Sequence, residues 1–159
     1  MEELIGILEE TPWWVYLILI YIVYMGVKAG SPRTIAIRKL VLLPLALTVW
    51  GLMGMAWTLT LLLLWAGSLI IGFGLGWFSV RKWKIRYDRG RGTLHLPGSY
   101  STLILALLFF CIKYFFGYYN ATHPEPAQEV LISQAAVSGV ISGMFIGRLA
   151  LFWKKYEAL

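Results

Sequence analysis

Charged residues are scarce in this 159-residue chain. Asp, Glu, Lys and Arg together make up 14% of it, whereas 59% is hydrophobic and the mean hydropathy is +0.71. An ordinary soluble domain carries about 25% charged residues. This composition excludes a sizeable soluble catalytic domain and predicts an integral membrane protein.

Cysteine is also scarce, because Cys111 is the single one and lies in an apolar run. A lone thiol excludes a disulfide framework and a thiolate metal cluster. Carboxylates are absent from the interiors of the apolar runs, and His95 and His123 are expected on opposite sides of the membrane. The sequence therefore predicts no catalytic residues, no metal site, no cofactor and no enzymatic activity.

Five apolar stretches approach the length of about 20 residues that a bilayer-crossing helix needs. The start, Met-Glu-Glu, lacks the basic region of a cleaved signal peptide, so the first stretch is expected to be retained. Residues 40–80 carry no charge, which favours two helices with a break between Gly54 and Thr60. The predicted fold is an all-α membrane protein, one domain of five transmembrane helices at about 13–27, 40–56, 59–80, 100–119 and 129–152.

Lysine and arginine lie almost entirely on one side of these predicted spans. Twelve of the 14 fall there, and the opposite side carries glutamates. Because positively charged short loops stay in the cytoplasm, the sequence predicts an outside N-terminus and a cytoplasmic C-terminus. The net charge of +6 is then expected to meet anionic lipid headgroups rather than nucleic acid.

Between the third and fourth predicted spans, polar and apolar residues alternate around a glycine-rich centre. Over about 84–96 this pattern predicts a short cytoplasmic β-hairpin in which Asp88 pairs with Thr93 and Tyr87 faces Leu94. Its apolar side either rests on the bundle or offers an edge to a partner. The residues expected to bind lipid headgroups or to dock a partner are Arg81, Lys82, Lys84, Arg86, Arg89, Arg91 and His95.

Small residues recur at every fourth position of the last predicted span. This spacing places them on one helix face, which is typical of close packing between membrane helices. The neighbouring helix belongs either to the same chain or to a second copy. The predicted packing residues are Ala135, Gly139, Gly143 and Gly147, with Gly72 and Gly76 as candidate mates in the third span.

Two basic residues fall within predicted spans, where a charge is costly and indicates function. Lys113 either snorkels outward past Tyr114 or faces a polar cavity or a partner group. Arg148 is expected to reach the inner headgroups. If the chain carries a solute, then Lys113, Tyr114 and Arg148 are its candidate pathway residues.

Three segments of the chain are similar to a known protein family. They are GTLHLPGS at residues 92–99, FCIKYFFG at 110–117, and the ending with Gly143, Gly147 and Arg148. Together they resemble an uncharacterised family of small bacterial polytopic inner-membrane proteins. This resemblance implies five spans and a bacterial inner membrane, and it brings no activity. A more distant similarity is to the CcdC-type proteins associated with cytochrome c maturation.

The sequence favours a non-enzymatic structural or accessory protein that assembles with itself or with a larger membrane complex. The alternative is a small channel or carrier for an anionic or amphipathic solute or a lipid, with Lys113 in the pathway. In both cases the expected partners are membrane lipids with anionic headgroups, and no nucleic acid.

Overall fold

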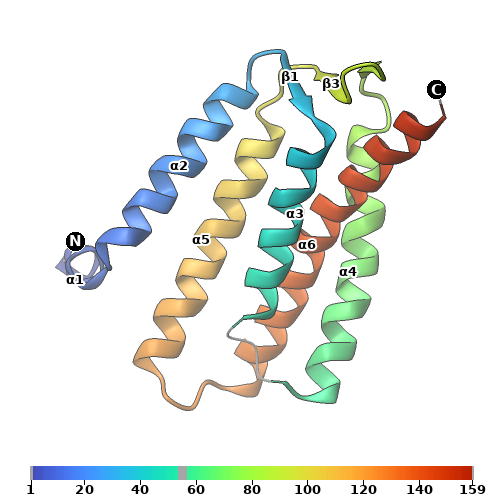
Figure 1. Ribbon diagram of the computed structural model, residues 1–159. Helices are drawn as coiled ribbons and strands as arrows, with labels where there is room; N and C mark the ends of the chain where they lie inside the picture. The colour runs from blue at the N-terminus through green and yellow to red at the C-terminus, as the bar shows by residue number, and fades with distance from the viewer. Residues whose placement is uncertain (1, 54–56, 159) are drawn as a thin grey trace.

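A computed structural model describes residues 2–53 and 57–158, without the side chains of residues 2–4. Helices α2 to α6 stand side by side, and a small sheet lies at one end of them (Figure 1). The helices are α1 (Glu2–Glu10), α2 (Trp13–Ala29), α3 (Ile37–Leu52), α4 (Leu59–Val80), α5 (Ser101–Thr122) and α6 (Gln128–Glu157), and the strands are β1 (Arg33–Ala36), β2 (Arg86–Asp88) and β3 (Thr93–Leu96).

Three of these helices, α4, α5 and α6, are long and apolar enough to cross a membrane. The other two helices of the bundle, α2 and α3, have 17 and 16 residues. Large apolar side chains point outward from α2 to α5, for example Ile20, Leu42, Ile70 and Ile104. Such a broad apolar surface is typical of contact with a membrane rather than with water.

Helix α3 differs from the span expected over 40–56, because it begins at Ile37 and ends at Leu52. The end of that expected span, and part of the break expected between Gly54 and Thr60, lie outside the described residues. Helix α4 begins at Leu59, where the Thr58 hydroxyl accepts a hydrogen bond from the backbone N–H of Leu61 at 3.4 Å. This N-cap satisfies one of the free amides at the start of the helix.

The predicted hairpin is confirmed, with Asp88 opposite Thr93 and Tyr87 opposite Leu94. The sheet has a third strand that the sequence did not predict, since β1 pairs antiparallel with β3 and the strand order is β1-β3-β2. A short helix, α1, was also not predicted. Strand β1 thereby connects the segment between α2 and α3 to the hairpin.

Glycines allow α6 to approach α4 backbone to backbone. A Cβ atom added at Gly143 would collide with the carbonyl oxygen of Leu69, and one at Gly147 with that of Phe73. From the other side, a Cβ at Gly72 would collide with the carbonyl oxygen of Val140. The small-residue face of α6 is thus occupied by α4 of the same chain.

Helix α2 packs on α5, away from this tight pair. Gly26 lies against the side chain of Leu103, and Gly30 against the ring of Tyr100. The backbone N–H of Ser99 donates to the carbonyl oxygen of Ala29 at 2.9 Å, which joins the end of α2 to the start of α5. Compared with the α4–α6 pair, α5 makes little close contact with α6. The bundle therefore divides into two groups, α3 with α4 and α6, and α2 with α5, which make few close contacts with each other.

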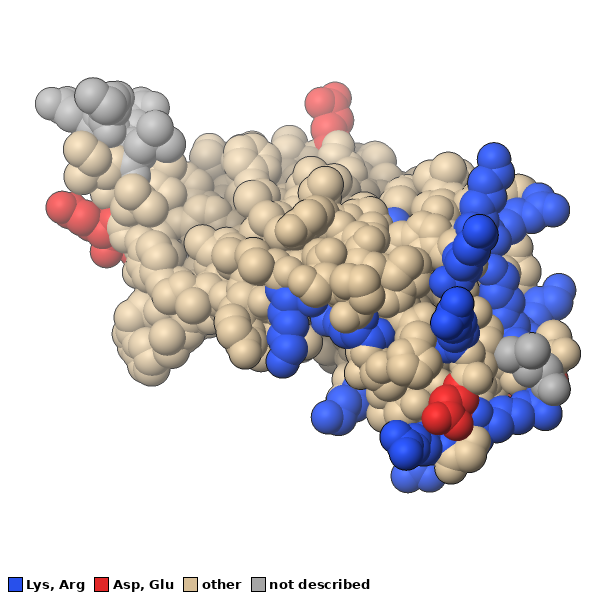
Figure 2. Space-filling model, turned by 90° about the horizontal axis from the view of Figure 1, so that it is seen from above, with Lys and Arg blue, Asp and Glu red and all other residues tan. Residues whose placement is uncertain are grey.

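Lysine and arginine gather at the sheet end. Helices α2, α4 and α6 end there, and α3 and α5 begin there. Figure 2, which looks down on this end, shows the basic side chains spread over it, away from the N-terminal helix. The α1 end of the molecule carries Glu9 and Glu10. The charge asymmetry of the sequence is therefore an asymmetry between the two ends of the fold.

The hairpin rests on the end of α6. Leu94 and Leu96 are buried, and Leu96 packs in a cluster with Val80 and Phe152. The Tyr87 hydroxyl donates to the carbonyl oxygen of Phe152 at 3.3 Å. Burial raises the pKa of Tyr87 to about 12.

Gly143→Ala tests the α4–α6 contact. The added methyl group meets the Leu69 carbonyl, and overpacking of this kind costs about 1–3 kcal/mol. We expect the melting temperature of the purified protein in detergent to fall. The matched control is Gly74→Ala in α4, where an added Cβ has no neighbour within 4 Å. Equal melting temperatures of the two variants would contradict this packing.

The hydroxyl of Tyr87 gives a pH-dependent contribution to stability. Its pKa is about 12 in the folded protein and near 10 when unfolded. The contribution is therefore fully present below pH 10 and is lost as the pH rises to about 12. Tyr87→Phe removes this dependence, so the melting temperature of the variant should fall less steeply than that of the wild type between pH 10 and 12. An equal fall of the two melting temperatures would contradict the burial of the hydroxyl.

Candidate functional site

A cavity of about 350 Å³ lies at the sheet end, between α2, α3, α5 and α6. Four cationic side chains line it, one from each of α2, β1, α3 and α6. None of the described residues that line it is Asp or Glu. We call this cavity the basic pocket. Its cations are Lys28, Arg33, Lys39 and Arg148.

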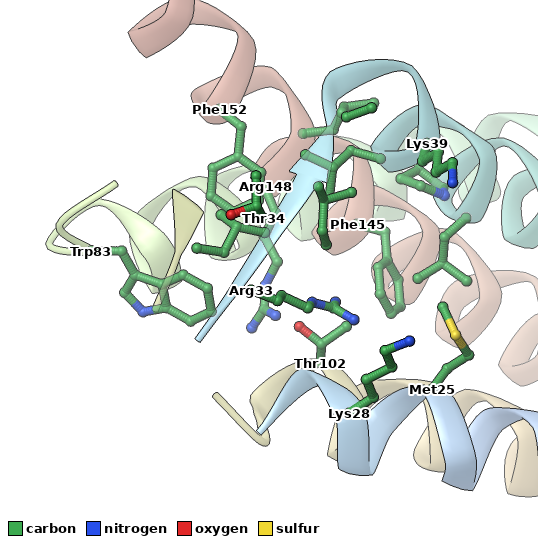
Figure 3. A pocket seen from close by; sticks show the side chains of 17 residues that line it. Met25, Lys28, Arg33, Thr34, Lys39, Trp83, Thr102, Phe145, Arg148 and Phe152 are labelled. Carbon is green, nitrogen blue, oxygen red and sulfur yellow. The ribbon is translucent and has the colours of Figure 1, made fainter. Parts of the chain in front are cut away.

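Two of the four cationic groups reach the interior of the basic pocket, and the other two lie on its exposed walls. Figure 3 shows the side chains of Arg33 and Arg148 reaching the region beside Thr102, at the start of α5. Lys28 points toward Phe145 and Met25, and Lys39 lies apart from the other three cations. The other walls are mostly apolar. They include Met25, Leu40, Leu43, Pro44, Leu149 and Phe152.

Arg148 forms the buried end of the basic pocket, with 7% of its surface exposed. Its Nε donates to the Ser79 hydroxyl at 3.1 Å, and its Nη1 donates to the Ser101 hydroxyl at 3.4 Å. The ring of Trp83 lies 6.0 Å from the guanidinium carbon. The side chain is thus directed into the pocket, whereas the sequence led us to expect it at the headgroups. Both hydrogen-bond partners are neutral, so the charge of Arg148 remains uncompensated by them.

Strand pairing positions Arg33. Its partner in the sheet is Leu96, and Thr34 next to it contacts His95, with 2.7 Å between the Thr34 hydroxyl oxygen and Nδ1 of the ring. Burial lowers the pKa of Arg33 from its ordinary value. A guanidinium nevertheless stays protonated at neutral pH, so Arg33 presents a permanent positive charge to the pocket.

Two helices also begin at the basic pocket. Ala36, the N-cap of α3, lines it together with Lys39 of the first turn, and so does Thr102 near the start of α5. The N-cap residues, Ala36 and Tyr100, make no side-chain cap bond, and the first amides of the two helices donate to the Gly92 carbonyl and the Ser99 hydroxyl. The N-terminal end of a helix carries a partial positive charge and free N–H groups. Four cations and two such helix ends, with no acid among the described wall residues, form a site that is chemically suited to an anion.

Lys113 lies in a different cavity, at the other end of the bundle. This second cavity has a volume of about 500 Å³ and lies beneath α1. Lys113 is 8% exposed, and its Nζ donates to the carbonyl oxygen of Gly51 at 3.2 Å. Lys113 was expected either to snorkel outward or to face a cavity or a partner group. Its side chain is directed toward α3 and lines a cavity. Tyr114 lines the same cavity, and its hydroxyl contacts the Thr11 hydroxyl.

The hairpin residues predicted to bind headgroups are on the surface of the sheet end. Arg81, Lys82, Lys84, Arg86, Arg89, Arg91 and His95 are all exposed, and none of them lines the basic pocket. Arg89 also donates through Nη2 to the carbonyl oxygen of Glu157 at 3.2 Å, at the end of α6. These residues therefore lie at the same end of the molecule as the basic pocket but do not form its walls.

Sequence reasoning missed Lys28, Arg33 and Lys39 as site residues. It assigned them only to the positive side of the membrane. A signal was present, because all three flank the short link between the first two spans, and no acidic residue occurs within that link. Their place in one cavity with Arg148, more than 100 residues later in the chain, depends on the packing of α6 and was not readable from the sequence.

Known proteins add a family but no activity. Residues 1–156 match DUF6622, a family of unknown function. No curated protein and no solved structure matches the chain. The similarity to CcdC-type proteins therefore stays a prediction. In the described part of the chain, no group of three or more His, Cys, Asp or Glu side chains is arranged to hold a metal ion.

Proposed function

The chain belongs to DUF6622, a family of unknown function, and from the site itself we propose that it is a non-enzymatic membrane protein that binds an anionic phospholipid headgroup in the basic pocket. The observation that carries the proposal is that Lys28, Arg33, Lys39 and Arg148, from four separate elements, line one cavity that has no acidic wall residue among those described. Arginine and lysine are the side chains that bind phosphate oxygens.

The apolar wall favours a lipid over a free anion. Met25, Leu43 and Pro44 line the same cavity as the cations, and they lie farther along their helices from the sheet end than Lys28 and Lys39. Helices α2 and α3 are not packed closely against each other, and Met25 and Leu43 are exposed on the outer surface. A ligand with a charged head and an apolar chain fits this order of residues, with its chain between α2 and α3.

The placement in the membrane follows from the helices and the charges. We propose five spans, α2 to α6, in a bacterial inner membrane, with the sheet end in the cytoplasm and the N-terminus outside. Helices of 16 and 17 residues reach about 25 Å, somewhat less than the hydrocarbon core of about 30 Å. Trp13 and Trp14 at the start of α2, and Lys28 at its end, are the kinds of side chain that anchor a short span at both interfaces.

The two hypotheses from the sequence are supported unequally. Assembly with a second copy or a larger complex rested on the glycine face of α6, which α4 occupies in this chain, and on the partly apolar hairpin, whose Leu94 and Leu96 are buried. A role with an anionic lipid gains support from the basic pocket, but its key residues are Arg33 and Arg148 in place of Lys113. The exposed basic residues of the hairpin would then draw anionic lipid toward the pocket, since each contributes about 1 kcal/mol near a negatively charged membrane surface.

Arg33→Gln and Arg38→Gln form a matched pair that tests headgroup binding. Both remove one arginine charge from the same end, but Arg33 lines the basic pocket and Arg38 is exposed outside it. A lost charged hydrogen bond costs about 1.5–3 kcal/mol, so Arg33→Gln should weaken phosphatidate binding by about tenfold or more. We expect Arg38→Gln to stay within about twofold. Native mass spectrometry of the protein in neutral detergent, titrated with phosphatidate or phosphatidylcholine, measures both.

Two results of that titration would contradict the proposal. Equal losses in the two variants would mean that phosphatidate binds to the general charge of the surface. Equal affinities of the wild type for phosphatidate and phosphatidylcholine would mean that the basic pocket does not select an anion.

Cysteine labelling tests the orientation. In a Cys111→Ser background, Gly90→Cys places a thiol in the hairpin turn and Glu125→Cys places one between α5 and α6. Because positively charged loops stay inside, a membrane-impermeant maleimide should label the Glu125→Cys protein in intact cells and the Gly90→Cys protein after permeabilisation. The opposite labelling pattern would reverse the proposed topology.

A further inference from the structure

We infer that the cavity beneath α1 binds a long-chain fatty acid, with its carboxylate on Lys113 and its chain against the aromatic wall. This second ligand site is separate from the basic pocket and does not depend on the function proposed for it. It lies at the end of the bundle that carries Glu9 and Glu10, which is the outer end under the proposed topology.

Lys113 is the charged group of this cavity. It lines the cavity, only 8% of it is exposed, and its one hydrogen bond to a described residue is the bond to the Gly51 carbonyl oxygen. An ammonium carries three N–H donors, so one neutral acceptor leaves most of its capacity unused. A buried charge is costly without an opposite charge or further hydrogen bonds. A carboxylate supplies both, because its two oxygens accept hydrogen bonds and carry the compensating negative charge.

The bond to Gly51 also fixes where the ammonium lies. Gly51 is in the last turn of α3, where carbonyl oxygens have no partner within the helix and carry a partial negative charge. Lys113 thereby binds the end of α3 through one N–H and remains on the cavity wall. It is nine residues before the end of α5, about 13 Å along the helix axis.

The walls of the cavity suit an apolar chain. Aromatic side chains line it from three helices, namely Trp14 of α2, Trp50 of α3 and Phe110 of α5. The rings of Phe110 and Tyr114 stack with their centroids 6.4 Å apart. The volume of about 500 Å³ lies within the range of about 300–1,000 Å³ that is usual for small-molecule sites.

The turn after α1 forms the roof of the cavity and is held in place. The Thr11 hydroxyl donates to the carbonyl oxygen of Ile7 at 2.6 Å and contacts the hydroxyl of Tyr114 on α5. The Tyr114 hydroxyl also donates to the same Ile7 oxygen, at 3.4 Å. Ile7, Thr11 and Tyr114 all line the cavity, so the bonds that position α1 also fix this wall of the site.

The charges favour an anion with a single negative charge. Lys113 is the one cationic residue among the described cavity walls, and Glu10 stands exposed at the margin. Glu10 repels any anion in this cavity, and it repels a phosphomonoester with two negative charges more than a carboxylate with one, which Lys113 alone can neutralise. The two cavities are thus expected to select different amphiphiles: a phosphate at the four cations of the basic pocket and a carboxylate at Lys113.

A crossed experiment tests this selectivity. Lys113→Met and Arg148→Met each remove one buried cation, from different cavities. Binding of radiolabelled palmitate and of phosphatidate is measured for both variants in the same neutral detergent. We expect Lys113→Met to weaken palmitate binding by about tenfold or more and to leave phosphatidate within about twofold. Arg148→Met should give the reverse result, and Lys113→Arg should retain palmitate.

A second variant avoids any loss of folding from the change of a buried charge. Gly117 lines the cavity, and a Cβ added there has no neighbour within 4 Å. Gly117→Leu therefore adds a side chain to the cavity wall at a position whose Cβ is free of neighbours, and should weaken palmitate binding with little change of melting temperature. Gly67→Leu, which also adds a side chain in open space but on α4, is the matched control and should bind palmitate like the wild type.

The outcomes separate this inference from the proposed function. Absence of saturable palmitate binding to the wild type, or palmitate affinities unchanged in both Lys113→Met and Gly117→Leu, would overturn the fatty-acid site and leave the basic pocket untouched. Absence of phosphatidate binding alone would overturn the basic pocket and leave the fatty-acid site.

Discussion

The close approach of α6 to α4 determines most of the remaining structure. Apolar side chains gain little by leaving lipid for another apolar surface, so membrane helices associate mainly through backbone proximity and van der Waals contact. Gly139, Gly143 and Gly147 provide this proximity and fix the rotation of α6 about its axis. Arg148 follows Gly147 directly, so the same rotation places its side chain beside the α4 contact, where Nε donates to Ser79 of α4 and Nη1 donates to Ser101 of α5. The position of the buried arginine is therefore a consequence of the glycine register.

The sparse contact of α2 and α5 with the rest of the bundle leaves room for both cavities. Each cavity has α2 and α5 on one side and α3 on the other, and neither includes a residue of α4. Where backbones meet through glycine, as between α4 and α6, no space of this size remains. The fold thus combines a tightly packed part, which defines the geometry, with a less tightly packed part, which leaves volume for ligands. Large side chains line this volume, for example Phe145 in the basic pocket and Trp50 in the cavity beneath α1.

Sequence patterns predicted the elements whose determinants are local. The alternation around residues 90–92 predicted the register of Asp88 with Thr93, and apolar runs predicted long helices such as α4. Strand β1 has four residues and pairs with β3 about 60 residues away, so its local signal was too short to separate it from a linker. The basic pocket was not predictable for a related reason. Its residues come from four separate elements, and their place in one cavity depends on helix rotations that packing sets.

An apolar cluster between the two cavities favours two binding sites over a continuous pathway. Leu47, Phe109, Ile141 and Phe145 are buried together, and Trp50 packs against them. Phe145 lines the basic pocket, and Trp50 lines the cavity beneath α1, so the cluster occupies the space from one cavity to the other. The ring of Trp50 meets that of Phe109 edge to face at 5.7 Å. An anion passing from Arg148 to Lys113 would have to part these rings and lose all its polar partners on the way. Separate ligands, each entering from its own end of the bundle, require no such opening, and they place each buried cation beside the anion that compensates it.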